Sequence, residues 1–190
     1  RKERGSQSRK RWNRAGIIIS TAYLLLCTAF HAYANSRMEA TLKKENIVAS
    51  RHLIGPTILN SVLWQGTAET DTSFFTGQYS FFDPEPYFKL REVPKQHELI
   101  AGHEEDRDVH LLRWFANGYY NVEREDSTTY RINDLRYGSI DVPGRERPVH
   151  IFYFVVEEKD GELRTIRVQQ GPEDRQASIG GLWDRVMGRY

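Results

Sequence analysis

The sequence is poor in cysteine and lacks the best-known motifs of catalytic sites. Cys27 is the only cysteine among its 190 residues, which excludes a disulfide bond within the chain and a zinc site built from cysteine ligands. There is no G-x-S-x-G nucleophile elbow, no P-loop, no G-x-G-x-x-G dinucleotide fingerprint and no H-E-x-x-H metal motif. The net charge is only +1, so overall electrostatics give no reason to expect binding to nucleic acid.

The first 34 residues divide into a basic segment and an uncharged one. Residues 1–14 hold seven Lys or Arg and a single Glu, whereas residues 15–34 (AGIIISTAYLLLCTAFHAYA) hold no Asp, Glu, Lys or Arg. About 20 such residues in a helix cross a hydrocarbon core of roughly 30 Å, which predicts a transmembrane helix over 15–34. A cleavable signal peptide is the alternative, because it also has a basic start and an apolar core. The length of the apolar run favours the membrane anchor.

The basic excess before the span predicts its orientation. By the positive-inside rule, residues 1–14 lie in the cytoplasm and everything after residue 35 lies on the extracytoplasmic side. The lipid bilayer is therefore an expected partner. The sequence begins at Arg1, and we expect it to be part of a longer protein.

The membrane helix is expected to continue into a helical stalk over residues 35–54. Met38, Leu42, Ala49 and Leu53 have the spacing of an apolar helical stripe, and there is no strong helix breaker before Gly55-Pro56.

Residues 55–190 predict an α+β domain. β-Branched and aromatic residues indicate strands within 58–70 and 73–82 and a third strand at 87–93. Apolar residues at helical spacing between 109 and 116, followed by Gly118, predict a helix. Two hairpins are then expected, one turning at Asp126-Ser127 and one at Asp160-Gly161, before a terminal helix in the tail. These elements predict a mainly antiparallel β-sheet with flanking helices.

The stretch HEEDRDVH, residues 103–110, is the richest polar cluster. His103 and His110 lie seven residues apart with carboxylates between them, which makes them weak candidates for metal ligands. Acidic residues are also favourable at a helix N-terminus, so a solvated helix start explains the cluster better. No catalytic residue is identified in the chain.

The stretch YRINDLRYG, residues 130–138, places Asp134 and Arg136 two residues apart in an expected strand. Side chains at this spacing share a face of a strand, so the two charges can pair. A neighbouring arginine lowers the pKa of a carboxyl group, which argues against general acid–base catalysis. We interpret the pair as structural, tying down residues 139–147; the alternative is an arginine that binds a phosphate or carboxylate ligand.

Three stretches together resemble a known family: GPTILNSVLWQGTAETDTSFFTGQYSFFD, LLRWFANGYYNVE and YRINDLRYG. They are similar to the C-terminal half of the bacterial membrane-bound metal-dependent hydrolases, which include the YdjM and YfhP proteins. The resemblance runs in order over most of residues 16–140. Its positions of structural or ligand interest are Asn60, Trp64, Gly77, Tyr79, Asp134, Arg136 and Gly138.

The resemblance implies a divalent metal in the full-length family, held by a bundle of membrane helices that carries a His-Arg-x-x-Thr-His-Ser type motif. None of the six histidines of this sequence lies in such a motif, so no cofactor is expected in this chain. The chain is then the C-terminal, membrane-anchored portion of a hydrolase of the bacterial inner membrane, accessory to catalysis and packed beside other membrane helices of the same protein. A non-catalytic, membrane-anchored binding domain is the alternative.

Overall fold

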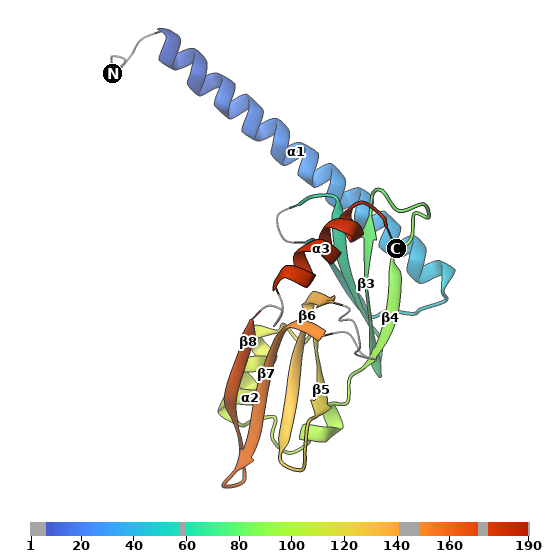
Figure 1. The fold of residues 1–190 in the computed structure, drawn as a ribbon, viewed down its shortest axis with the longest axis vertical. Helices are drawn as coiled ribbons and strands as arrows, with labels where there is room; N and C mark the ends of the chain where they lie inside the picture. Colours follow the sequence, from blue (N-terminus) through green and yellow to red (C-terminus); the bar gives the residue numbers. More distant parts are fainter. Residues whose placement is uncertain (1–6, 58–59, 141–148, 171–174, 190) are drawn as a thin grey trace.

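One long helix leads into two four-stranded antiparallel sheets in the computed structural model, which describes residues 7–57, 60–140, 149–170 and 175–189 (Figure 1). The expected α+β class is therefore confirmed. Part of the basic segment, residues 1–6, lies outside the described residues, as do residues 141–147 of the loop expected to be tied down by Asp134 and Arg136. The elements are α1 (Gln7–Lys44), β1 (Arg51–Pro56), β2 (Leu63–Glu69), β3 (Ser73–Ser80), β4 (Lys89–Pro94), η1 (His97–Ile100), α2 (Arg107–Phe115), β5 (Tyr120–Arg124), β6 (Thr129–Ile140), β7 (Val149–Lys159), β8 (Glu162–Gln170) and α3 (Arg175–Val186).

Helix α1 has an exposed apolar half and a half that packs on the protein. Its 38 residues include an apolar window that is long enough to cross a membrane and not buried by the rest of the chain. In the C-terminal half, by contrast, Ala34, Met38 and Leu42 are buried. The first half of the helix is thus apolar and exposed, whereas the second half buries apolar residues against sheet A.

The prediction that the helical stalk extends to residue 54 is wrong. The helix ends at Lys44, because Asn46 adopts a positive φ of 56° and the Ile47 and Asn46 amides donate to the carbonyls of Leu42 and Lys43. This is the Schellman arrangement that terminates helices. Residues 51–56 form strand β1 instead, which pairs with β2 in sheet A.

Sheet A, in the order β1-β2-β3-β4, receives the second half of α1 on one face. Residues of the helix interlock with aromatic and aliphatic side chains of the sheet. This core consists of Ala34, Met38 and Leu42 from α1 and Ile54, Trp64, Ala68, Tyr79 and Phe88 from the sheet and its loops. Removing these side chains from water is the main force that docks the helix, at about 1.5–3 kcal/mol for each large apolar side chain.

Sheet B, in the order β5-β6-β7-β8, packs one face on α2 and η1. The two expected hairpins, β5–β6 and β7–β8, are both present and are paired through β6 and β7. Asp160 and Gly161 have φ values of 55° and 80°, which the tight turn of the second hairpin requires.

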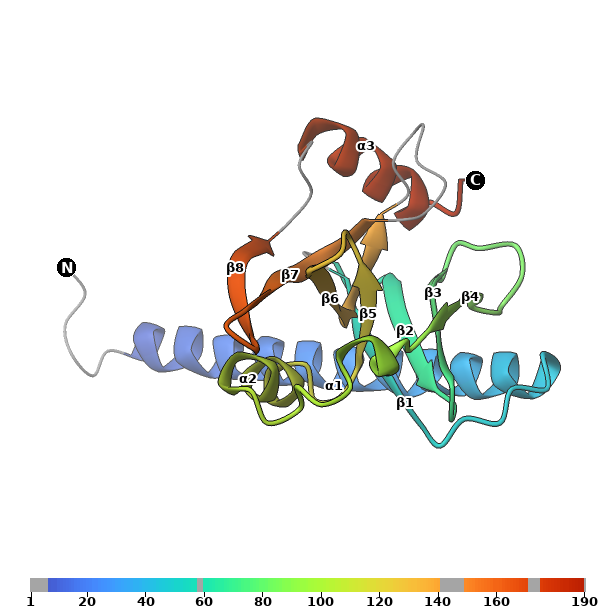
Figure 2. The ribbon, with the colours of Figure 1, turned by 90° about the horizontal axis from the view of Figure 1, so that it is seen from below.

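The two sheets meet through β6. Leu135 of β6 is fully buried against Phe74 of sheet A and Tyr119, and its carbonyl accepts a hydrogen bond from the Thr67 hydroxyl at 2.9 Å. Helix α3 then returns to sheet A, where the Ser80 hydroxyl donates to the carbonyl of Val186. Figure 2 shows the sheets lying between α1 and α3.

Candidate functional site at the junction of α1 and sheet A

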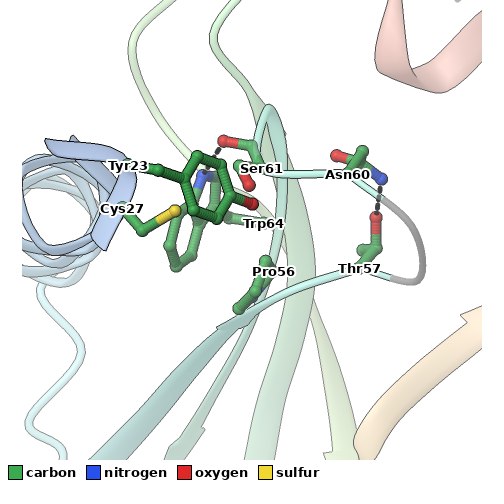
Figure 3. A pocket seen from close by; sticks show the side chains of 7 residues that line it. All are labelled: Tyr23, Cys27, Pro56, Thr57, Asn60, Ser61 and Trp64. Atoms are coloured by element: carbon green, nitrogen blue, oxygen red, sulfur yellow. Dashed lines mark hydrogen bonds between the residues drawn. The ribbon is translucent and has the colours of Figure 1, made fainter. Parts of the chain in front are cut away.

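A hollow lies where α1 meets the end of sheet A (Figure 3). This junction cavity has a volume of about 660 Å³. Tyr23 and Cys27 face it from the helix, and the other lining residues come from the segment between β1 and the start of β2: Pro56, Thr57, Asn60, Ser61 and Trp64. Asn60 and Trp64, two of the positions singled out by the family resemblance, thus lie together at one site.

Asn60 holds the segment that forms the cavity wall. Its amide nitrogen donates to the Thr57 hydroxyl at 2.7 Å, and its side-chain oxygen accepts from the backbone amides of Val62 (3.0 Å) and Leu63 (2.7 Å). An asparagine that bonds the backbone two and three residues ahead replaces a regular turn. Asn60 therefore fixes the entry into β2.

Trp64 closes the cavity from the sheet side. The side chain is buried, and its indole N–H donates to the Ser61 carbonyl at 3.2 Å. The ring centroid lies 5.7 Å from that of His31 on α1 and 6.3 Å from that of Phe81. Trp64 is thus the link between the helix and the aromatic residues at the end of β3.

Gly77 and Tyr79 lie on β3 and do not line the cavity. A Cβ at Gly77 would approach the Lys89 carbonyl oxygen to 2.0 Å, so the close pairing of β3 and β4 requires glycine there. Tyr79 is buried. Burial is the main cause of the raised pKa of its hydroxyl, and a hydrogen bond with Tyr33 is the second cause. Both positions support the sheet rather than a reactive group.

Asp134 and Arg136 form a two-pronged ion pair in sheet B, away from the cavity. The Arg136 Nε and Nη2 atoms donate to the two Asp134 oxygens at 3.0 and 2.6 Å, and the Arg136 backbone amide donates to Oδ1 at 3.0 Å. The hydrogen bonds from Arg136 to Asp134 raise the pKa of the guanidinium. The guanidinium also lies 5.2 Å from the centroid of the Phe115 ring. All of these contacts are internal to the fold.

Gly138 lies beyond the ion pair, where the β6–β7 register shifts. Its φ is +78°, and a Cβ there would lie 2.5 Å from the Gln65 side-chain oxygen of sheet A. The positive φ is the reason for glycine here, since the end of the Gln65 side chain can move away from a Cβ.

His103 and His110 do not converge on a metal-ligand set. His103 pairs with Asp106 at 2.8 Å, whereas His110 is exposed. Asp106 also accepts the Leu163 amide at 2.7 Å, which is the main cause of the lowered pKa of this carboxyl. Within the described parts of the chain, no group of three or more His, Cys, Asp or Glu is placed to hold a metal ion.

Two ion-pair systems were not predicted from the sequence. Asp83 and Arg185 form a buried pair between the β3–β4 connection and α3. Glu69 binds both Arg51 and Lys95; burial alone would raise the pKa of Glu69, but these two hydrogen bonds outweigh it and hold the pKa below its usual value. Their partners are 18 to 102 residues apart, a separation that leaves no local pattern to detect.

Comparison with protein-family models, with curated proteins and with solved structures finds no match for this chain.

Proposed function

We propose that this chain is the membrane-anchored C-terminal portion of a metal-dependent hydrolase of the bacterial inner membrane and is accessory to catalysis. The observation that carries the membrane anchoring is helix α1, which is apolar and exposed along one half and packed on sheet A along the other, whereas the hydrolase part of the proposal rests on the family resemblance. A helix of this design holds a β-sheet domain at a fixed place beside a bilayer.

The docking of α1 is specific as well as apolar. Thr41 of the helix is buried, and its hydroxyl accepts the backbone amide of Phe88 at 2.9 Å. Opposite Met38, a Cβ added to Gly66 would lie 3.1 Å from the Met38 sulfur, so the helix packs closely on the sheet at this glycine. The helix and sheet A are therefore packed together rather than joined only by a linker, as positioning a neighbouring active site requires.

The donors in the described residues do not fit a catalytic divalent metal. The Asp134 carboxylate is bound to Arg136, and that of Asp106 is occupied by His103 and the Leu163 amide. The metal suggested by the family resemblance would then be held by other membrane helices of the same full-length protein, and this domain would support them from the extracytoplasmic side.

The basic residues at the start of α1 support an extracytoplasmic position of the domain. Arg9, Lys10, Arg11 and Arg14 precede the apolar run within α1, and Lys43 and Lys44 lie at the opposite end, where Glu39 and Glu45 offset them. The positive-inside rule then places residues 1–14 in the cytoplasm and the domain outside.

The test is metal content and activity of the chain against the full-length protein. Residues 1–190, extracted from membranes in detergent, should carry no stoichiometric zinc or manganese and show no hydrolase activity, whereas the full-length protein should have both. A tight one-to-one metal in the chain alone, lost on His103→Ala or His110→Ala, would overturn the proposal.

A non-catalytic binding domain is the second candidate, and one surface favours it. Leu111 and Trp114 of α2 are exposed to 55% and 73%, because the helix packs on sheet B through Val109 and Leu112 instead. If Trp114→Ala abolished capture of a partner while the full-length protein showed no hydrolase activity, this candidate would replace the first.

A further inference from the structure

The uncharged run of α1 is longer than the part of it that precedes the contacts with the domain. Residues 15–34 measure close to the roughly 30 Å of a hydrocarbon core. The domain contacts one side of the last eight residues of the run: Cys27 is half-buried, the Phe30 ring centroid lies 5.1 Å from that of Phe81, and Ala34 is fully buried. The stretch before these contacts, from Ala15 to Leu26, spans only about 18 Å.

Starting the span earlier does not remove this shortfall. Trp12 would add only about 4.5 Å, and it would bring Arg14 into the hydrocarbon layer. A span that crosses the bilayer must therefore include the turns that carry Cys27 and Phe30. The part of the domain that contacts those turns then lies at the same depth.

We propose that the end of sheet A formed by residues 56–57, 60–64 and 80–82, here called the junction edge, is embedded in the outer leaflet of the bilayer, and that the junction cavity holds an acyl chain of a phospholipid. This inference rests on the proposed membrane anchoring by α1 and extends it from the helix to the domain.

The junction edge has the charge pattern that such a position demands. Residues 53–68 contain no Asp, Glu, Lys or Arg. The nearest carboxylate after β3, Asp83, is buried and neutralised by Arg185, with side chains exposed to only 1% and 3%. Beside it, the Phe82 ring is 58% exposed and offers an apolar surface that can insert into a bilayer.

Four backbone amides of the edge are satisfied within the edge itself. The Thr57 amide donates to the Leu63 carbonyl, the Phe81 amide donates to the Val62 carbonyl, and the Asn60 side-chain oxygen accepts from the amides of Val62 and Leu63. Irregular backbone is costly in a lipid environment unless its hydrogen bonds are made internally. These four amides meet that condition without water.

The lining of the cavity suits the acyl chain of a lipid. Tyr23, Cys27, Pro56 and Trp64 give it an apolar wall, and Thr57, Asn60 and Ser61 give it a polar one (Figure 3). At the depth of Tyr23 and Cys27, the medium around α1 is hydrocarbon rather than water, so an acyl chain is the available occupant.

The four tryptophans supply the test, by quenching with phospholipids brominated on their acyl chains. Three full-chain variants each keep one tryptophan and have the others changed to phenylalanine. The remaining tryptophan reports on one place: Trp12 on the inner end of the span, Trp64 on the cavity and Trp114 on the water-exposed domain. Trp12, Trp114 and Trp183 are 63–73% exposed, so Trp→Phe at these positions costs little stability. The Trp12 and Trp114 variants additionally need Trp64→Phe, and their fold is checked by circular dichroism.

In phosphatidylcholine and phosphatidylglycerol vesicles, we expect brominated lipids to quench Trp64 as strongly as Trp12, and to leave Trp114 unquenched. Adding Cys27→Phe, which narrows the cavity, should reduce the quenching of Trp64 and leave that of Trp12 unchanged in its own variant. Quenching of Trp12 without quenching of Trp64 would overturn this inference and leave the anchoring intact. Absence of quenching at Trp12 would overturn the anchoring itself.

Discussion

Asp83 and Arg185, 102 residues apart in sequence, form an ion pair that is almost completely buried. Arg185 also donates to the Gln78 carbonyl at 2.9 Å, and Asp83 accepts the Ser80 amide at 2.9 Å. The pair fastens the C-terminal helix to the end of β3, next to the junction edge. Helix α3 is thus fastened to sheet A on the side opposite α1.

Removing one member of this pair should be strongly destabilising. Arg185→Met leaves the Asp83 carboxylate buried without its cation, and we expect the free energy of unfolding to fall by about 3–5 kcal/mol. The matched control is Arg164→Met, because the Arg164–Glu162 pair is exposed to more than half on both sides and should contribute less than about 1 kcal/mol. Urea unfolding in detergent measures both, and equal losses would contradict the account of α3.

The Asp134–Arg136 pair should behave as a structural element. Arg136→Ala leaves a fully buried carboxylate, so the free energy of unfolding should fall by about 3 kcal/mol, with Arg136→Lys intermediate because lysine cannot make the two-pronged contact. Thermal melting gives the stability, and full-length hydrolase activity is assayed beside it. Unchanged melting with lost activity would assign the pair a functional role instead.

Alanine substitutions at two glycines of sheet A should have opposite effects on stability. Gly77→Ala drives a Cβ into the Lys89 carbonyl and should destabilise β4 by several kcal/mol, whereas Gly55 has open space around its Cβ position. Gly55→Ala should therefore be neutral or stabilise by about 0.4–1 kcal/mol through the unfolded chain. Hydrogen exchange of the β4 amides, faster only in the first variant, checks the location of the effect.

Stability should decline as pH falls from about 7 to 5. Burial lowers the pKa of His150 and of His97, so the folded state keeps them neutral while the unfolded chain takes up protons. The two histidines therefore contribute their full stabilisation above the pKa of the unfolded state. This contribution is lost as the pH drops toward the lower pKa of the folded state. His150→Leu should reduce this slope, and His110→Gln, at an exposed site, should not; a slope unaffected by His150→Leu would show that other groups cause it.

The hairpins and α2 could be predicted because their signals are local. Asp160-Gly161 fits a tight turn by itself, and the apolar spacing of α2 depends on nine consecutive residues. The two strands on either side of Thr70 to Thr72 were also confirmed, as β2 and β3.

Strand β1 could not be predicted, because long-range pairing overrides a local pattern. Ala49 and Leu53 continue the helical spacing of Met38 and Leu42, yet Leu53 pairs with Thr67 in β2. The one local sign of the helix end is Asn46, a residue type that tolerates the left-handed conformation. The junction cavity was missed for the same reason, since it joins Tyr23 and Cys27 to Asn60 and Trp64 through the docking of α1.

The most direct measurement is site-specific proteolysis in spheroplasts. A protease site inserted in the exposed turn at Asp160-Gly161 should be cut by protease added outside intact spheroplasts, while the same site inserted ahead of Arg9 should be cut only after lysis. The cut protein should stay in the membrane fraction after alkaline washing, because α1 remains in the bilayer. Cleavage at Asp160-Gly161 that requires lysis, or release of the uncut chain by the wash, would contradict the account of an extracytoplasmic domain anchored by α1.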